Sequence, residues 1–162
     1  MSENAALKLN SSSTGSPEIL FYFSDEARAA GLSFKSPRDL DAGFDLPALE
    51  DVAISPHSIA VVRTGIHVAI PEGWVGLVRD RSSVAVRGGH TIAGVIDASY
   101  RGEIKVAIYN LLQTPLQFSK GERIAQLVVV EHLSGRAGRS VDSLEALGST
   151  DRGAGGFGST GR

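Results

Sequence analysis

Short apolar runs separated by glycine and proline dominate the pattern along the chain. Each run is five to seven residues long and rich in valine, isoleucine or aromatic side chains, which is typical of β-strands. The runs that we predict to be strands are residues 19–23, 58–64, 66–70, 73–78, 91–96, 104–110 and 124–130. Strands of this length with frequent turn signals favour an all-β sandwich, jelly roll or barrel.

Helical periodicity is scarce. We predict short helices only in residues 24–31 and 81–86, with Ser82 or Ser83 as a candidate cap of the second helix. No strand–helix–strand unit is visible, which argues against a doubly wound nucleotide-binding fold.

Composition divides the chain into three zones. Residues 1–17 are rich in serine and asparagine and offer little to bury, so we predict a disordered N-terminal arm. Residues 18–133 contain the predicted strands and form the expected β-domain. Residues 134–162 hold many glycines and few large apolar groups, and we predict a flexible C-terminal arm.

Charge and cysteine content narrow the classes of function. A length of 162 residues fits one domain, and a net charge of -2 argues against a nucleic-acid or membrane-surface binder. The absence of cysteine excludes thiol catalysis and cysteine-ligated metals. No apolar run approaches the roughly 20 residues of a membrane span. Because no signal-peptide pattern is present either, we expect a cytoplasmic protein.

Asp97 is the first candidate catalytic residue. It follows an apolar strand and precedes a turn that contains Tyr100, Arg101 and Gly102. A carboxylate in this position could act as a general base or hold a metal-bound water. The alternative is a strand-end aspartate that only makes a turn.

Arginine and two hydroxyls meet at the start of the second predicted helix. The guanidinium of Arg81 offers a fork of donors, and Ser82 and Ser83 add hydroxyls, which together suit an anion. The alternative is a capped helix with a surface arginine.

The glycine-rich end of the chain formally matches a dinucleotide fingerprint. That interpretation fails because the fingerprint needs a helix after it, and no lysine precedes Ser159 and Thr160 as a phosphate-binding P-loop requires. Dense glycine still lets backbone amides approach a phosphate. Arg152 adds positive charge and Phe157 an aromatic face, whereas the alternative is a plain mobile tail.

Two further segments carry polar groups in apolar surroundings. Gln126 lies within the apolar run of residues 121–127, where its amide needs a partner. Residues 41–46 place two acids around a glycine, which indicates a turn or a polar site near a metal. The four histidines are scattered and show no zinc-binding spacing.

Five segments, taken together and in order, resemble the five motifs of the trimeric dUTPase family. They are residues 41–46, 81–85, 94–103, 121–127 and 152–160. The resemblance implies a jelly-roll-like β-barrel subunit, a homotrimer with active sites between subunits, and a tail that folds over a neighbouring site. It also implies a magnesium-dependent enzyme that hydrolyses dUTP to dUMP and diphosphate.

The resemblance assigns chemistry to two carboxylates. Asp97 would orient and deprotonate the water that attacks the α-phosphorus, and Asp45 would hold a metal-bound water. Because aspartate is a weak base, Mg²⁺ would do much of the work by binding the triphosphate and stabilising the leaving diphosphate.

The same resemblance assigns the substrate contacts. Tyr100 would pack beneath the deoxyribose and exclude a 2′-hydroxyl, and Phe157 would stack on uracil. Backbone groups of the hairpin at residues 91–96, including Gly94 and Ile96, would read the base and refuse the thymine methyl by steric clash. The expected phosphate contacts are Arg81, Ser82 and Gln126, with Arg152, Ser159 and Thr160 at the γ end. Ser83 and Gly158 are further expected substrate-binding residues.

Two positions depart from the family pattern. Asp80 lies where proline is common, and an acid there would either weaken phosphate binding or point outward. Thr91 lies where some members have an asparagine that contacts uracil, so it receives no role.

Two other functions were weighed against dUTP hydrolysis. A dCTP deaminase shares the fold, but its glutamate and arginine would fall at Ala107 and Val86, so the acid–base groups are missing. A non-catalytic regulatory protein on this scaffold should have lost Asp97, Tyr100 or the tail motif, and all are present. A regulatory role in addition to catalysis is an alternative that the sequence leaves open.

Overall fold

The fold is known from a computed structural model that describes residues 18–35, 37–133 and 138–151. The chain divides into two compact units, Met1–His132 and Leu133–Arg162. In the described part of the second unit the regular element is a short 3-10 helix, η2 (Glu145–Leu147). No helix in the described ranges is long and apolar enough to cross a membrane.

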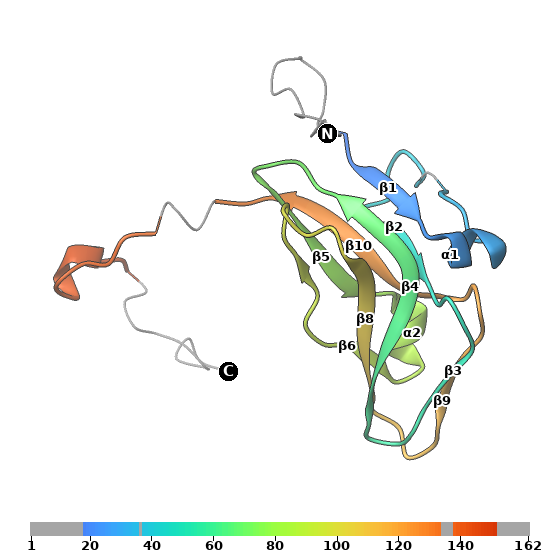
Figure 1. The fold of residues 1–162 in the computed structure, drawn as a ribbon. Helices are drawn as coiled ribbons and strands as arrows, with labels where there is room; N and C mark the ends of the chain where they lie inside the picture. Colours follow the sequence, from blue (N-terminus) through green and yellow to red (C-terminus); the bar gives the residue numbers. More distant parts are fainter. Residues whose placement is uncertain (1–17, 36, 134–137, 152–162) are drawn as a thin grey trace, which may run out of the picture. The chain divides into compact units, whose positions relative to one another are not determined.

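The first unit is built from strands, which confirms the all-β prediction (Figure 1). Its strands are β1 (Leu20–Phe23), β2 (Phe44–Pro47), β3 (Val52–Ile54), β4 (Ile59–Ala69), β5 (Trp74–Asp80), β6 (Gly89–Thr91), β7 (Val95–Ile96), β8 (Glu103–Asn110), β9 (Leu116–Phe118) and β10 (Arg123–Glu131). Two short helices, α1 (Asp25–Ala29) and α2 (Ser82–Val86), interrupt them.

The strands form two four-stranded sheets and one two-stranded ribbon. One sheet has the order β1-β4-β8-β6, the other β2-β10-β5-β7, and β3 pairs with β9. All of these pairings are antiparallel. Side chains of both large sheets contribute to one buried apolar cluster, including Val106 and Ile108 of β8 and Ile124 and Leu127 of β10. The alternation of buried and exposed positions along β8 follows the two-residue period of a half-buried strand.

Strand β4 runs through the position where the sequence predicts a break. The two strands predicted at residues 58–64 and 66–70 are one strand, β4 (Ile59–Ala69), because Gly65 lies in a bulge with φ +67°. A β-carbon on Gly65 would lie 2.7 Å from that of Ala27, so the glycine also lets α1 approach the sheet. Ser24 caps α1 by accepting a hydrogen bond from the Ala27 amide.

The predicted strand at residues 91–96 is divided between the two sheets. Strand β6 pairs with β8 in the first sheet, whereas β7 pairs with β5 in the second. Between them Ala93 and Gly94 have positive φ values of 63° and 106°, a conformation that ends a strand. At α2, Arg81 rather than a serine occupies the N-cap.

Candidate active site

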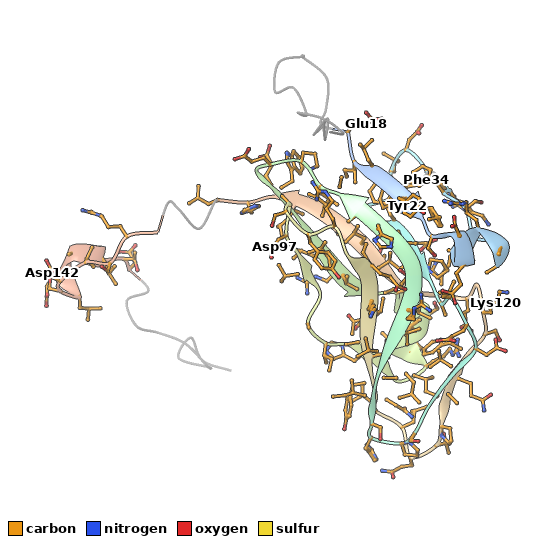
Figure 2. The ribbon with its side chains drawn as sticks, viewed as in Figure 1. Glu18, Tyr22, Phe34, Asp97, Lys120 and Asp142 are labelled. Atoms are coloured by element: carbon orange, nitrogen blue, oxygen red, sulfur yellow. The ribbon has the colours of Figure 1, made fainter. Side chains whose placement is uncertain are left out.

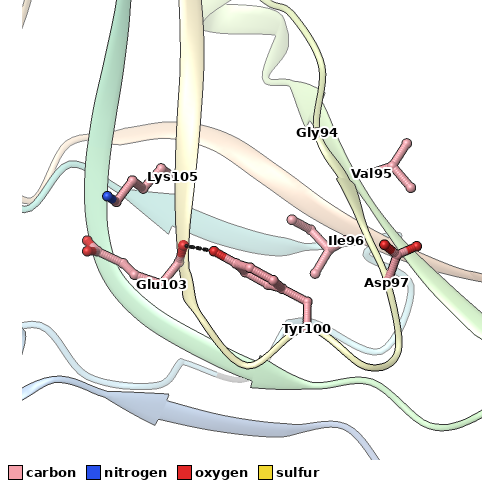
Figure 3. A pocket seen from close by; sticks show the side chains of 7 residues that line it. All are labelled: Gly94, Val95, Ile96, Asp97, Tyr100, Glu103 and Lys105. Atoms are coloured by element: carbon pink, nitrogen blue, oxygen red, sulfur yellow. Dashed lines mark hydrogen bonds between the residues drawn. The ribbon is translucent and has the colours of Figure 1, made fainter.

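A small cavity is lined by strand β7, the turn that follows it, and strand β8 (Figure 3). We call it the hairpin cavity, and its volume is about 260 Å³. The residues that line it are Gly94, Val95, Ile96, Asp97, Tyr100, Glu103 and Lys105. Four residues that the sequence marks as functional therefore lie together: Gly94, Ile96, Asp97 and Tyr100.

Tyr100 forms a fixed wall of the hairpin cavity. Its hydroxyl donates to the Glu103 carbonyl over 2.9 Å, and its amide donates to the Asp97 carbonyl over 3.0 Å. A β-carbon at Gly102 would collide with the tyrosine hydroxyl. The ring is therefore held from both ends, while 43% of the residue stays exposed and available for contact.

The two carboxylates of the hairpin cavity differ in their partners. Glu103 accepts from the Gly65 amide (2.9 Å) and from the Arg63 guanidinium (3.2 Å). Burial raises the pKa of Glu103, but these two bonds together hold that pKa below its ordinary value. The Asp97 side chain is exposed and has no hydrogen-bond or ion-pair partner in the described part of the chain, and Figure 2 shows Asp97 at the surface of the first unit. The Glu103 carboxylate thus stabilises the fold, whereas the Asp97 carboxylate is available to bind water or a ligand.

A larger and more charged cavity lies beside strands β2 and β10. We call it the arginine cavity, and its volume is about 570 Å³. The residues that line it are Lys35, Pro37, Arg38, Asp41, Ala42, Gly43, Asp45, Arg81, Ser82, Ser83, Arg123 and Gln126. Four cationic side chains face two carboxylates there, which makes the cavity suited to an anion with several charges.

Asp45 lies between two arginines of this cavity. Its carboxylate is 2.9 Å from Arg81 Nε and 3.1 Å from Arg123 Nη1. Strand pairing explains the arrangement, because β2 sets Asp45 opposite Gln126 and β10 begins at Arg123. Gln126 donates through Nε2 to the Asp80 carbonyl over 3.0 Å. The ion pair with Asp45 holds the guanidinium of Arg81, the N-cap residue of α2, in place.

The donor set of the arginine cavity fits a magnesium ion that arrives with its ligand. Within the described ranges no group of three or more His, Asp or Glu side chains gathers to hold a metal. Magnesium is commonly bound through one or two carboxylates together with substrate phosphates. Asp45, with a side chain 41% exposed in a cationic cavity, matches that pattern.

The site residues predicted from the sequence are thus divided between the two cavities, apart from those outside the described residues. Asp45, Arg81, Ser82, Ser83 and Gln126 line the arginine cavity, and the remaining described candidates line the hairpin cavity. Residues 1–17 and the tail candidates, Arg152, Phe157, Gly158, Ser159 and Thr160, lie outside the described residues.

Sequence reasoning missed three cations of the arginine cavity. Arg123 lies inside the fourth motif-like segment, so its place beside Gln126 was a usable signal. Lys35 and Arg38 precede the first motif-like segment in a stretch without periodicity, and nothing in the sequence marks them.

Comparison with known proteins gives one consistent result. The family model for dUTPase matches residues 30–161. The deoxyuridine 5′-triphosphate nucleotidohydrolase of Corynebacterium jeikeium is 50% identical over 125 residues, covering 75% of this chain and 80% of that protein.

Solved structures agree. A Staphylococcus bacteriophage 80alpha dUTPase mutant with dUpNHpp has a TM-score of 0.76 at 28% identity, covering 91% of this chain and 100% of that one. A dUTPase mutant from phage phi11 of S. aureus, solved with the coordination of a structural Mg(II) ion, has a TM-score of 0.68 at 26% identity, covering 79% and 99%. These likenesses bear out the jelly-roll-like fold, and together with the family match they show that the chain belongs to the dUTPase family.

Proposed function

We propose that this chain is a dUTP diphosphatase in which Asp97 activates water for attack on the α-phosphorus of dUTP. The new bond joins the water oxygen to the α-phosphorus. The bond from that phosphorus to the α–β bridging oxygen breaks, so dUMP and diphosphate leave. The observation that carries this proposal is the Asp97 carboxylate, which is unpaired among residues 18–35, 37–133 and 138–151, beside the fixed ring of Tyr100 in the hairpin cavity.

Asp97 accepts the proton that the attacking water loses. Its side chain is exposed and has no partner among the described residues, which leaves both carboxylate oxygens able to hold a water molecule. Tyr100 packs against the deoxyribose and leaves no room for a 2′-hydroxyl. Backbone groups from Gly94 to Ile96 line the cavity and contact the uracil, and a steric clash with this hairpin opposes a thymine methyl.

The arginine cavity binds the phosphates. Arg81 offers a guanidinium already held by Asp45, and Ser82, Ser83 and Gln126 add donors at the same wall. Such preorganised donors stabilise charge that develops on the leaving diphosphate. When bound, Mg²⁺ supplies further charge neutralisation on the triphosphate, with Asp45 as the nearby carboxylate that holds one of its waters.

We place the complete site between the subunits of a homotrimer. The hairpin cavity and the arginine cavity have no lining residue in common, which suits a site that neighbouring chains complete. The tail residues Arg152, Gly158, Ser159 and Thr160 would close over the γ-phosphate, and Phe157 over the base. Closure would exclude water from the reaction.

The proposal is tested by diphosphate release from dUTP, dTTP, dCTP and UTP in the presence of Mg²⁺. We expect fast release from dUTP alone, reduced about 100-fold or more by Asp97→Asn, because the amide cannot accept the proton. Asp51→Asn is the matched control, since the Asp51 carboxylate accepts from the Lys120 amide at a turn outside both cavities. No release from any nucleotide would overturn the proposed activity, and a fully active Asp97→Asn enzyme would overturn the role of the base.

A further inference from the structure

The hairpin that carries the base-binding residues joins two different sheets. Its first strand, β6, is at the edge of the β1-β4-β8-β6 sheet, and its second strand, β7, is at the edge of the β2-β10-β5-β7 sheet. Ala93 and Gly94 make the crossing with positive φ values. Left-handed backbone is uncommon for alanine and persists where the surroundings determine it. Contacts that hold the two strands in register therefore control the shape of the hairpin cavity.

One side chain links the two sheets at the base of this hairpin. Asp80, the last residue of β5, accepts from the Thr91 amide over 2.6 Å through Oδ1. Its Oδ2 is 2.7 Å from Nδ1 of His90. Both partners are in β6, so a carboxylate of the second sheet fixes the edge strand of the first. The Asp80 side chain is thus directed to β6 and does not line the arginine cavity; its effect on phosphate binding stays a prediction.

The electrostatics of this contact favour a charged Asp80. Burial raises the pKa of its carboxyl, but the hydrogen bonds from Thr91 and the bond and charge of His90 hold that pKa below its ordinary value. The carboxylate therefore accepts both bonds at neutral pH, and Nδ1 of His90 carries the hydrogen. Only 25% of the Asp80 side chain is exposed, so water replaces these bonds poorly.

Asp80 also touches the arginine cavity through the backbone. Its carbonyl accepts from Gln126 Nε2 over 3.0 Å, and the next residue is Arg81, which begins the phosphate-binding segment. The main chain of Asp80 thus contacts Gln126 of the arginine cavity. Its side chain contacts strand β6, which leads into the hairpin cavity.

We propose that Asp80 is a positioning residue for base selection, which holds β6 against β5 and so sets the width of the hairpin cavity. This inference rests on the proposed hydrolysis of dUTP. Asp80 does not line either cavity, so it acts on the base only through the backbone from Thr91 to Ile96. Releasing that backbone widens the space that refuses a methyl group at position 5 of the pyrimidine.

The first test compares kcat/KM for dUTP and dTTP in the wild type and Asp80→Ala. We expect the ratio of the two values to fall about tenfold, because a small displacement of a binding group has large kinetic effects. Asp80→Asn keeps an acceptor for the Thr91 amide and should lie between the two. Asp51→Ala is the control, since it removes an equivalent carboxylate–amide bond at a distant turn. It should leave the ratio unchanged.

The second test is hydrogen exchange of the backbone amides of residues 91–96, which needs no substrate. Asp80→Ala should accelerate exchange there, and Asp51→Ala should not. If Asp80→Ala does not fold, His90→Ala replaces it, because the His90 side chain is 56% exposed. For that variant we expect about a threefold loss of selectivity, a part of the tenfold effect.

The possible results separate the inference from the proposed function. A wild type that hydrolyses no nucleotide overturns the proposed function and, with it, the inference. An active Asp80→Ala enzyme with wild-type selectivity overturns the inference alone. Equal losses of thermal stability in Asp80→Ala and Asp51→Ala, with unchanged selectivity and unchanged hairpin exchange, would show that Asp80 is merely structural.

Discussion

The two cavities of this chain differ in the charge of the residues that line them. The arginine cavity is made by side chains with full charges, drawn from the segment before β2, from β2 itself, from the start of α2 and from β10. The hairpin cavity is smaller and less cationic: it is lined by Gly94, two aliphatic residues and the ring of Tyr100, and its one cation, Lys105, lies with two carboxylates, Asp97 and Glu103. Charge attracts any polyphosphate, whereas a narrow space selects one nucleoside. From this difference we infer that affinity for the phosphates and selection of the nucleoside are located in separable parts of the molecule.

The largest effect, a loss of catalytic efficiency without a loss of selectivity, is expected from Arg81→Ala. Loss of this guanidinium should lower kcat/KM for dUTP by about 100- to 1000-fold, as removal of a preorganised donor to developing charge does. The ratio of dUTP to dTTP hydrolysis should stay the same, because the hairpin cavity is unaltered. Arg28→Ala serves as the control, since Arg28 pairs with Asp25 on the surface of α1. Lost selectivity in Arg81→Ala would show that the two cavities are not separable.

Gly102→Ala should instead lower selectivity and leave the binding of dUTP less affected. The added methyl would collide with the Tyr100 hydroxyl and displace the ring. We expect the preference for dUTP over UTP to fall about tenfold, since the sugar then loses its steric boundary, with KM for dUTP changing less. Steady-state kinetics on both nucleotides measure this. Tyr100→Phe keeps the ring but loses the bond to the Glu103 carbonyl, so wild-type behaviour in Gly102→Ala with lost selectivity in Tyr100→Phe would refute the steric explanation.

The last prediction concerns stability and not selectivity. Glu103 lines the hairpin cavity, and its carboxylate stabilises the fold through Arg63 and Gly65. Glu103→Gln should lower the free energy of unfolding at pH 7 by about 1–3 kcal/mol, because it weakens charge-assisted bonds. The pKa of Glu103 is lowered from 4.5 in the folded chain. Its contribution is therefore complete above that value and is lost as pH falls through the folded pKa. Urea unfolding should show a difference between wild type and variant at pH 7 that shrinks well below pH 4.5, and an equal difference at both pH values would contradict the assignment.

Much of the fold was predictable because long apolar strands have a strong pattern. The strands now labelled β5, β8 and β10 were predicted nearly to their ends. The three- and four-residue strands β2, β3 and β9 were missed, because so few positions cannot establish a period. Gly65 was read as a break because a glycine in a bulge and a glycine in a turn look alike in sequence.

The candidate site was predictable in its members more than in its arrangement. Arg81, Gln126 and Asp97 were selected by chemical type and order, and each lines a cavity. Their separation into two cavities follows from strand pairing over long distances in the chain, which no local pattern reveals. The direction of the Asp80 side chain has the same origin, since it depends on a hairpin that crosses between sheets.

The position of Asp45 has a consequence for product release. Two guanidiniums that would repel each other are kept together by an anion that belongs to the protein. On the proposed mechanism, an arriving phosphate would exchange one counterion of these arginines for another instead of meeting unpaired positive charge. The net gain from binding would be moderated, and on departure of diphosphate the carboxylate would pair with both arginines again. The proposed site would then be ready for the next turnover without a large rearrangement of the arginine cavity.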